Sequence, residues 1–274
     1  MNLSDHQRHP NNAPGIIIIP ARLQSRRLSR KLLLDSTGRP LLTYTIQQAQ
    51  LAVAASCGLF REVIVACDHS QLFELAQKAG VRAVLTSDAH SNGTSRITEA
   101  ILKISLSEDI SFVLNLQGDQ PELQPEAMIQ VGTDLIRHPQ CDMVTAAVEY
   151  PASDAALFAN PSVVKVAFDS CGYATDFYRH PAPANISLHT AEPTAWYRHV
   201  GIYAYRTDFL HRYVAAPQST REQQESLEQL RALEMGAMIR VSLITMDQAG
   251  GEIDTSDDYA DFVERMRHRQ AASP

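Results

Sequence analysis

The chain has 274 residues, a formal net charge of −7 and a hydrophobic share of 45%. These values are typical of one large α/β domain, or two small ones, with a sizeable buried core. The acidic balance argues against a general nucleic-acid surface. No apolar run approaches the ~20 residues of a membrane span. The four cysteines form no C-x-x-C pair, so we expect reduced thiols in a cytoplasmic protein.

The first half of the chain alternates between short apolar runs and longer amphipathic stretches. Residues 1–14 are polar and lack the apolar stretch of a signal peptide, so we expect a disordered tail. Ile16–Ile19 is a continuous apolar run ended by Pro20, which is typical of a strand buried on both faces. The following elements are expected in order: helix 40–56, strand 62–68, helix 70–80 with Ser70 as its cap, strand 81–86, helix 94–104, strand 111–119 and helix 125–138.

The second half changes character and predicts antiparallel strands. We expect these elements: strand 142–150, a hairpin over 162–179 with its turn at Asp169–Gly172, a loop over 180–194, strand 199–206, helix 220–236, strand 239–246 and helix 255–269. The pattern predicts an α/β fold: a doubly wound, mostly parallel sheet with a smaller antiparallel insertion. Residues 15–270 are predicted to form a single domain, in which 160–205 is the antiparallel portion.

Five cationic side chains directly follow the first buried strand, namely Arg22, Arg26, Arg27, Arg30 and Lys31. In an open parallel sheet, ligands bind beyond the carboxyl ends of the strands, so this segment lies at the expected binding edge. Arginine and lysine both suit phosphate oxygens. The chain has neither the G-x-G-x-x-G nor the G-x-x-x-x-G-K-[ST] pattern. We therefore expect a mononucleotide held by side chains at this edge.

Two aspartates and a polar loop are further candidates for this edge. Asp119 follows the expected strand 111–119 in "NLQGDQP", where a carboxylate opposite phosphates would bind Mg²⁺. A turn residue is the alternative for Asp119. Asp254 in "EIDTSDD" precedes a helix, and an ordinary capping role is its alternative. The loop "HSNGTSR", residues 90–96, can offer donors and acceptors to a nucleotide base.

Seven segments in sequence resemble the CMP-Kdo synthetases, the 3-deoxy-manno-octulosonate (Kdo) cytidylyltransferases. The segments are "PARLQSRRLSRK", "HSNGTSR", "NLQGDQP", "NPSVVKV", "RHVGIYAYR", "LEQLR" and "IDTSDD". The likeness runs from about Ile16 to Arg267. It implies a Rossmann-like nucleotidyltransferase fold.

The resemblance also implies roles for individual residues. For the phosphates and base of CTP it implies the nucleotide-binding residues Arg22, Ser25, Arg27, Lys31, Asn92, Gly93, Thr94 and Gln117. For Mg²⁺ it implies Asp119 and Asp254, which with Arg22 and Lys31 form the implied catalytic group. For the sugar acid it implies Arg179, His199, Tyr203, Glu228 and Gln229.

The implied reaction transfers CMP from CTP to the anomeric hydroxyl of Kdo, giving CMP-Kdo and pyrophosphate for lipopolysaccharide-type envelope synthesis. The expected partners are therefore CTP and an acidic 3-deoxy sugar, with Mg²⁺ as cofactor and no nucleic acid or membrane. The resemblance also suggests a homodimer formed through the antiparallel portion. The alternatives are a cytidylyltransferase for a nonulosonate or an amino-substituted Kdo, a catalytically silent binding homologue, and a sugar-1-phosphate nucleotidyltransferase that uses UTP or GTP.

Some residues beside the motifs depart from the family pattern. Ser29, Arg30 and Leu32 replace the usual Pro-Gly before the lysine and the proline after it, Asn92 replaces a serine, and Gln120 replaces an acid. The segment after Arg179 lacks the family's Ile-Pro-Trp and looks shorter. That segment borders the sugar pocket, so this last departure concerns the acceptor sugar more than the nucleotide.

Overall fold

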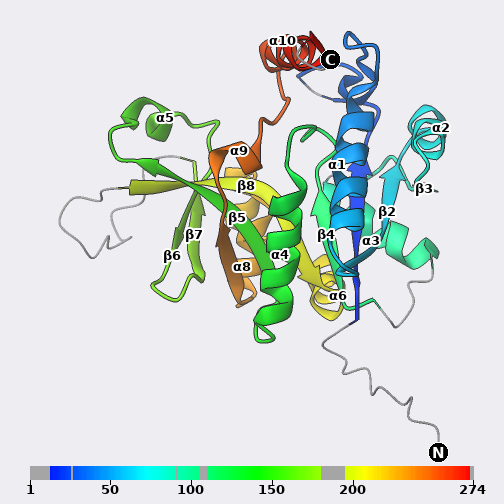
Figure 1. Cartoon of the computed structure of the whole chain (residues 1–274). Helices are drawn as coiled ribbons and strands as arrows, with labels where there is room; N and C mark the ends of the chain where they lie inside the picture. Colours follow the sequence, from blue (N-terminus) through cyan, green and yellow to red (C-terminus); the bar gives the residue numbers. More distant parts are fainter. Residues whose placement is uncertain (1–12, 26, 91, 105–109, 180–194, 272–274) are drawn as a thin grey trace, which may run out of the picture.

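One mixed β-sheet runs through the molecule, and helices cover both of its faces (Figure 1). The structure is a computed structural model that describes residues 13–25, 27–90, 92–104, 110–179 and 195–271. The predicted loop 180–194 lies outside these ranges, as does the predicted tail apart from Ala13 and Pro14. The sheet order is β3 (Arg82–Leu85), β2 (Phe60–Cys67), β1 (Gly15–Ala21), β4 (Phe112–Leu116), β8 (Ala195–Arg206), β5 (Met143–Pro151) and β9 (Ile239–Leu243).

Most neighbouring strands are parallel, and β8 is the exception at the centre of the sheet. It runs antiparallel to β4 on one side and to β5 on the other. The hairpin of β6 (Lys165–Phe168) and β7 (Ala174–Tyr178) lies off the main path, where β6 pairs with β8. The predicted doubly wound α/β fold with a smaller antiparallel part is therefore confirmed.

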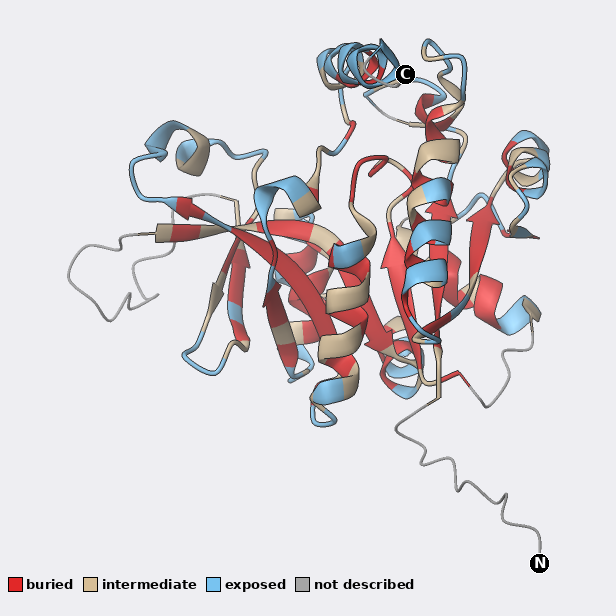
Figure 2. Cartoon of the chain, viewed as in Figure 1, coloured by how far each residue is buried: buried red, intermediate tan, exposed pale blue. Residues whose placement is uncertain are grey.

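Two apolar cores fill the two faces of the sheet. One core lies under α1 (Leu41–Ala55), α2 (Ser70–Lys78) and α4 (Pro125–Arg137), and the other under α3 (Gly93–Ile104), α6 (Thr207–Ala215) and α8 (Gln229–Glu234). Strand β1 contributes to both, because Ile17 and Ile19 point into the first core and Ile16 and Ile18 into the second. Figure 2 shows the central strands as buried. The strand is thus buried on both faces, as predicted.

A third apolar cluster attaches the C-terminal helix α10 (Ser256–Ala271) near the carboxyl end of β1 (Figure 1). Phe262 of α10 packs in this cluster with Leu41 of α1 and Ile253, and Leu28 of the loop after β1 packs against it. Arg265 of α10 also forms a 2.6 Å ion pair with Glu122, whose side chain is only 5% exposed. The C-terminal segment is therefore fixed beside the loop after β1.

The predicted helix 220–236 is wrong in one respect, because it is two helices. The first, α7 (Thr220–Glu225), starts at a capping box in which Ser219 and Glu222 bond each other's backbone N–H. It ends at Ser226, whose φ of 53° is left-handed and breaks the helix. The break places Glu228 directly before α8.

Other local features also differ from the sequence prediction. The N-cap of α2 is His69 rather than Ser70, because the His69 side chain accepts the hydrogen bond from the Gln71 N–H. The short elements that the pattern did not predict are η2 (Lys31–Leu33), α5 (Ala155–Ala159), α6 and α9 (Met246–Ala249). Within the described residues, no helix combines the length and the apolar character that a membrane crossing requires.

The first strand leaves no room for a side chain at Gly15. A Cβ atom there would lie 2.3 Å from Cζ of Phe112. Overpacking costs roughly 1–3 kcal/mol, so Gly15→Ala should lower the free energy of unfolding by about that amount in urea titrations. The control is Gly251→Ala, because the nearest atom to its Cβ would be Arg265 Nη2 at 3.5 Å. Equal losses in the two variants would contradict this packing.

Candidate active site

Two aspartates that are far apart in the sequence meet at one lysine. Nζ of Lys31 lies 2.7 Å from Oδ2 of Asp119 and 3.1 Å from Oδ1 of Asp254. Nη2 of Arg27 lies 2.7 Å from the other oxygen of Asp254. The structure therefore brings four of the predicted residues together at the carboxyl ends of β1 and β4.

The backbone around each aspartate explains why the two carboxylates converge. The Ile253 N–H donates to the Asp119 carbonyl at 3.0 Å, which joins the loop after β4 to the segment before α10. The Asp258 carboxylate accepts from the N–H groups of Asp254 and Thr255 at 3.0 and 2.7 Å. These bonds fix the turn that carries Asp254. Asp254 itself is therefore not the cap, and its carboxylate is directed at Lys31 and Arg27.

Lys31 remains charged although its side chain is buried. Burial alone would lower the pKa of the ammonium, but the charges and hydrogen bonds of Asp119 and Asp254 outweigh it and raise that pKa above its ordinary value. Its neighbour Arg30 has a left-handed backbone, with φ of 50°, where the family pattern has glycine. Nη2 of Arg30 donates to Oε1 of Gln71 at 2.6 Å, so this guanidinium points to α2 rather than to the aspartates.

Sequence reasoning missed a third acid beside the two aspartates, Glu252. Glu252 as a whole is exposed. Desolvation of its carboxyl, together with the charges of Asp119 and Asp254, raises the pKa of that carboxyl above its ordinary value. The single glutamate in "EIDT" does not by itself indicate a functional site. It becomes part of an acidic cluster only because the fold brings this segment next to Asp119.

The loop after β1 is anchored by Asp68, a second residue that sequence reasoning missed. Its Oδ1 accepts from the Leu23 N–H at 2.8 Å, and its Oδ2 pairs with the buried Arg96 at 3.2 Å. Arg22 and Ser25 make no hydrogen bond or ion pair with the described part of the chain, and Arg22 is exposed. The loop backbone is thus held while these two side chains stay available to a ligand.

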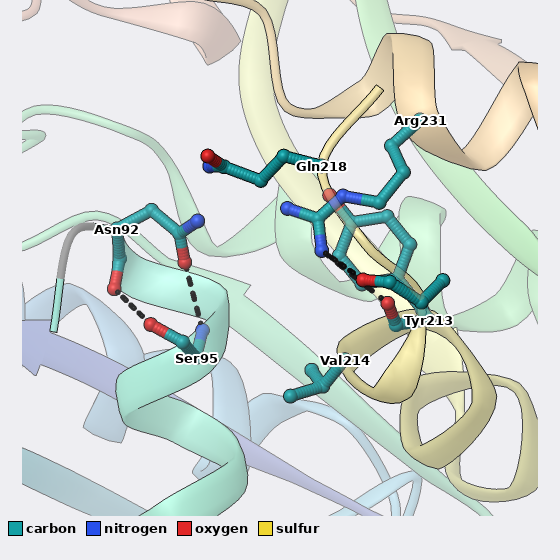
Figure 3. A pocket seen from close by; sticks show the side chains of 7 residues that line it. Asn92, Ser95, Tyr213, Val214, Gln218 and Arg231 are labelled. Atoms are coloured by element: carbon teal, nitrogen blue, oxygen red, sulfur yellow. Dashed lines mark hydrogen bonds between the residues drawn. The ribbon is translucent and has the colours of Figure 1, made fainter. Parts of the chain in front are cut away.

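The loop before α3 packs closely against the ends of β1 and β4. A Cβ atom on Gly93 would lie 3.1 Å from Cγ of Pro20 and 3.5 Å from the Gln117 amide, so glycine permits this approach. Oδ1 of Asn92 accepts from the Ser95 N–H at 2.9 Å and so caps α3. Asn92 and Ser95 also border a cavity of about 190 Å³ (Figure 3).

The side chain of Thr94 faces the predicted sugar residues. It is fully buried, and its Oγ1 donates to Oε2 of Glu228 at 3.0 Å. Burial raises the pKa of the Glu228 carboxyl, while the hydrogen bond from Thr94 acts in the opposite direction. Thr94 therefore connects the predicted nucleotide loop with the predicted sugar pocket.

The remaining predicted sugar residues form a connected group on β8 and α8. The rings of His199 and Tyr203 lie 5.5 Å apart, and the Tyr203 hydroxyl donates to Oε1 of Gln229 at 3.3 Å. Nε2 of His199 lies 2.9 Å from Oγ1 of Thr145. Burial, with the charges of Arg198 and Arg179, lowers the pKa of His199 to about 3, so the imidazole is neutral near pH 7.

Arg179 is near this group but does not point into it. Its guanidinium donates to the carbonyls of Glu225 at 3.1 Å and of Ser162 at 3.3 Å. Its charge still acts on His199 and Tyr203, where it opposes protonation of the first and favours ionisation of the second. The structure therefore places all five predicted sugar residues around one region.

Comparison with known proteins identifies relatives over most of the chain. A family model described as cytidylyltransferase matches residues 16–240. The 3-deoxy-manno-octulosonate cytidylyltransferase of Idiomarina loihiensis is 40% identical over 248 residues, which are 88% of this chain and 94% of that protein. The protein of the same name from Nitrosococcus oceani is 39% identical over 92% of this chain and 94% of its own length.

Solved structures show the same likeness. A CMP:2-keto-3-deoxy-manno-octonic acid synthetase in complex with CTP superposes with a TM-score of 0.81 at 32% identity, over 93% of this chain and 99% of that one. The 4-diphosphocytidyl-2C-methyl-D-erythritol synthase of Anaerococcus prevotii has a TM-score of 0.57 at 13% identity, over 92% of this chain and 99% of that one. This second likeness supports the fold alone.

The neutral state of His199 predicts a pH dependence of stability. Histidine titrates near 6.5 in an unfolded chain, so unfolding takes up a proton between about pH 6.5 and the lowered folded-state pKa of about 3. Stability should therefore fall as pH falls, with about 2 kcal/mol of the loss between pH 7 and pH 5 due to His199.

Urea denaturation at pH 7 and pH 5 tests this prediction. The difference in unfolding free energy between the two pH values should be smaller by about that amount in His199→Gln than in the wild type. His211→Gln, which changes an exposed histidine of α6, is the matched control and should behave as the wild type. The same difference in His199→Gln and wild type would contradict a neutral buried imidazole.

Proposed function

Because the chain belongs to the cytidylyltransferase family, and within it to the 3-deoxy-manno-octulosonate cytidylyltransferases, we propose that it transfers CMP from CTP to Kdo with release of pyrophosphate. The observation that carries this proposal is the meeting of Asp119 and Asp254 at Lys31, beside the cationic loop after β1. The product, CMP-Kdo, would serve lipopolysaccharide-type envelope synthesis.

The cationic loop answers the main difficulty of the reaction, which is charge repulsion. CTP and the sugar acid are both anions, and the anomeric hydroxyl of the sugar acid must attack the α-phosphate of CTP. Arg22, Arg27 and Lys31 lie at one edge of the sheet, where they can bind phosphate oxygens and stabilise the charge that builds during transfer. Holding both substrates in line lowers the barrier further. Direct transfer needs no covalent enzyme intermediate.

The two aspartates suit a divalent cation. Their carboxylates already share one cation, the Lys31 ammonium, at 2.7 and 3.1 Å. Within the described ranges, no set of three or more His, Cys, Asp or Glu side chains could hold a metal alone. Mg²⁺ does not require one, because it binds one or two carboxylates together with substrate phosphates and water. When bound by Asp119 and Asp254, Mg²⁺ would polarise the α-phosphate and lower the pKa of the attacking hydroxyl.

The connected side chains on β8 and α8 supply the groups for the acceptor. The neutral His199, the Tyr203 hydroxyl and the Gln229 amide offer hydrogen bonds to a polyhydroxylated ring. The Thr94–Glu228 hydrogen bond attaches this group to the loop that we assign to the cytosine. We also propose a cytoplasmic location and a homodimer formed through residues 160–205. Light scattering at several protein concentrations tests the dimer, because it measures the molar mass in solution.

A pyrophosphate-release assay tests the proposed function. Each of CTP, UTP and GTP is combined with Kdo, an amino-substituted Kdo and a nonulosonate. We expect release with CTP and Kdo that depends on Mg²⁺. Release with a different sugar acid only, or with UTP or GTP only, would replace the proposed substrates, and no release with any pair would favour a silent homologue.

Removal of the Asp119 carboxylate should nearly abolish turnover. Asp119→Ala deletes one of the two groups assigned to Mg²⁺, so we expect kcat/KM to fall by roughly 10³-fold in the pyrophosphate assay. The control is Asp247→Ala, an exposed aspartate in α9. Turnover of Asp119→Ala that stays near the wild-type rate and still depends on Mg²⁺ would refute this assignment.

Removal of the Arg22 guanidinium should weaken CTP more than the sugar acid. A charged hydrogen bond contributes about 1.5–3 kcal/mol, so Arg22→Ala should raise the KM for CTP about tenfold or more and change the KM for Kdo by less than about twofold. Arg137→Ala, in the last turn of α4, is the control. A larger effect on Kdo than on CTP would overturn the placement of Arg22.

A further inference from the structure

The side-chain oxygen of Gln120 is buried and accepts no hydrogen bond from the part of the chain that the structure describes. Gln120 directly follows Asp119 in the chain. The residue is only 4% exposed. Its Oε1 accepts no hydrogen bond, and the amide makes none with any residue that the structure describes. An unsatisfied buried polar group costs about 1–3 kcal/mol and is rare in native proteins. Such a group calls for a partner outside the chain.

The amide points from the aspartates toward the sugar-binding strand. Its Nε2 lies 3.6 Å from the place where a Cβ atom of Gly201 would be. Gly201 is on β8, two residues from His199 and two from Tyr203. A Cβ atom there would be in ordinary van der Waals contact with the amide, so the amide lies directly beside this strand. Gln120 thus lies between the shared cation site and the predicted sugar pocket.

A second amide in the same region is also incomplete. Nε2 of Gln229 is buried without a partner, although its Oε1 accepts from the Tyr203 hydroxyl. Gln229 belongs to α8, so the two amides come from different elements and reach the region of Tyr203 and Gly201 independently. An acceptor on one amide and a donor on the other, both left without a partner near β8, suit a ligand with several hydroxyl groups.

We propose that Gln120 is a specificity-determining residue that hydrogen-bonds the acceptor sugar next to its reacting carbon. The inference rests on the proposed function. An amide carries both donors and an acceptor without charge. The unpartnered Oε1 of Gln120 can therefore accept from a hydroxyl of the sugar acid, and its Nε2 can donate to a carboxylate or hydroxyl oxygen. A carboxylate at this position would add a further negative charge beside the carboxylates of Asp119 and Asp254, whereas the amide does not.

The isosteric variant Gln120→Met separates this role from a structural one. It removes a polar group whose buried oxygen has no partner among the described residues, so the thermal midpoint should stay equal to that of the wild type or rise. It also removes a hydrogen bond to the sugar acid, so the KM for Kdo should rise about tenfold. The KM for CTP should stay within about twofold.

The matched control is Gln124→Met, because Gln124 is in the same loop and its amide is satisfied. Nε2 of Gln124 donates to the Glu122 carbonyl at 2.8 Å. The same substitution should therefore lower the thermal midpoint and leave the KM for Kdo within about twofold of the wild-type value. Gln120→Met should therefore raise the KM for Kdo without loss of stability, whereas Gln124→Met should lose stability without a change in that KM.

Two results would overturn the role of Gln120. One is a KM for Kdo in Gln120→Met within twofold of the wild type, and the other is a fall in its thermal midpoint as large as that of Gln124→Met. If the wild-type protein releases no pyrophosphate with CTP and any of the sugar acids, the proposed function is refuted, and the inference about Gln120 is refuted as well. An active wild type with an unaffected Gln120→Met refutes the inference alone.

Discussion

The structure depends on one buried ammonium between two carboxylates. Lys31 pairs with Asp119 and Asp254, and the hydrogen bond from Ile253 to the Asp119 carbonyl keeps the two segments in contact. Burying a charged group is costly unless it is paired. The lysine therefore requires both aspartates, and the aspartates are held close together by it. This constraint places positive and negative side chains close together at the edge of the sheet. The positive side chains can bind a polyphosphate, and the carboxylates can bind a divalent cation.

The rest of the fold positions this charge cluster. The buried strand β1 ends at the edge and delivers the cationic loop, and Asp68 holds that loop through the Leu23 N–H. Helix α10 is attached by Phe262 and by the Arg265–Glu122 ion pair, so the far end of the chain brings Asp254 to the same place. Strand β8 lies between β4 and β5 and runs antiparallel to both. It carries His199 and Tyr203. The residues that we propose for the nucleotide and for the acceptor thereby come from neighbouring strands of one sheet.

Much of this was predictable from the sequence because it follows from local pattern. The apolar run of Ile16–Ile19, the alternation of strands and helices, and the position of Asp119 after a strand all come from neighbouring residues. The break at Ser226 was not predictable, since the leucine spacing continues through it and a left-handed residue alone ends the helix. The pairing of Thr94 with Glu228 and the roles of Glu252 and Gln120 depend on contacts between distant segments, which no local pattern reports.

We propose that Asp119 and Asp254 form one cation site facing the bound nucleotide. The most direct measurement is the anomalous diffraction of crystals grown with CTP and Mn²⁺, an ion that favours the same oxygen ligands as Mg²⁺. The account predicts a manganese peak within coordination distance of both carboxylates and of a phosphate oxygen. A peak bound by neither aspartate, with the two carboxylates still paired only to Lys31, would contradict it.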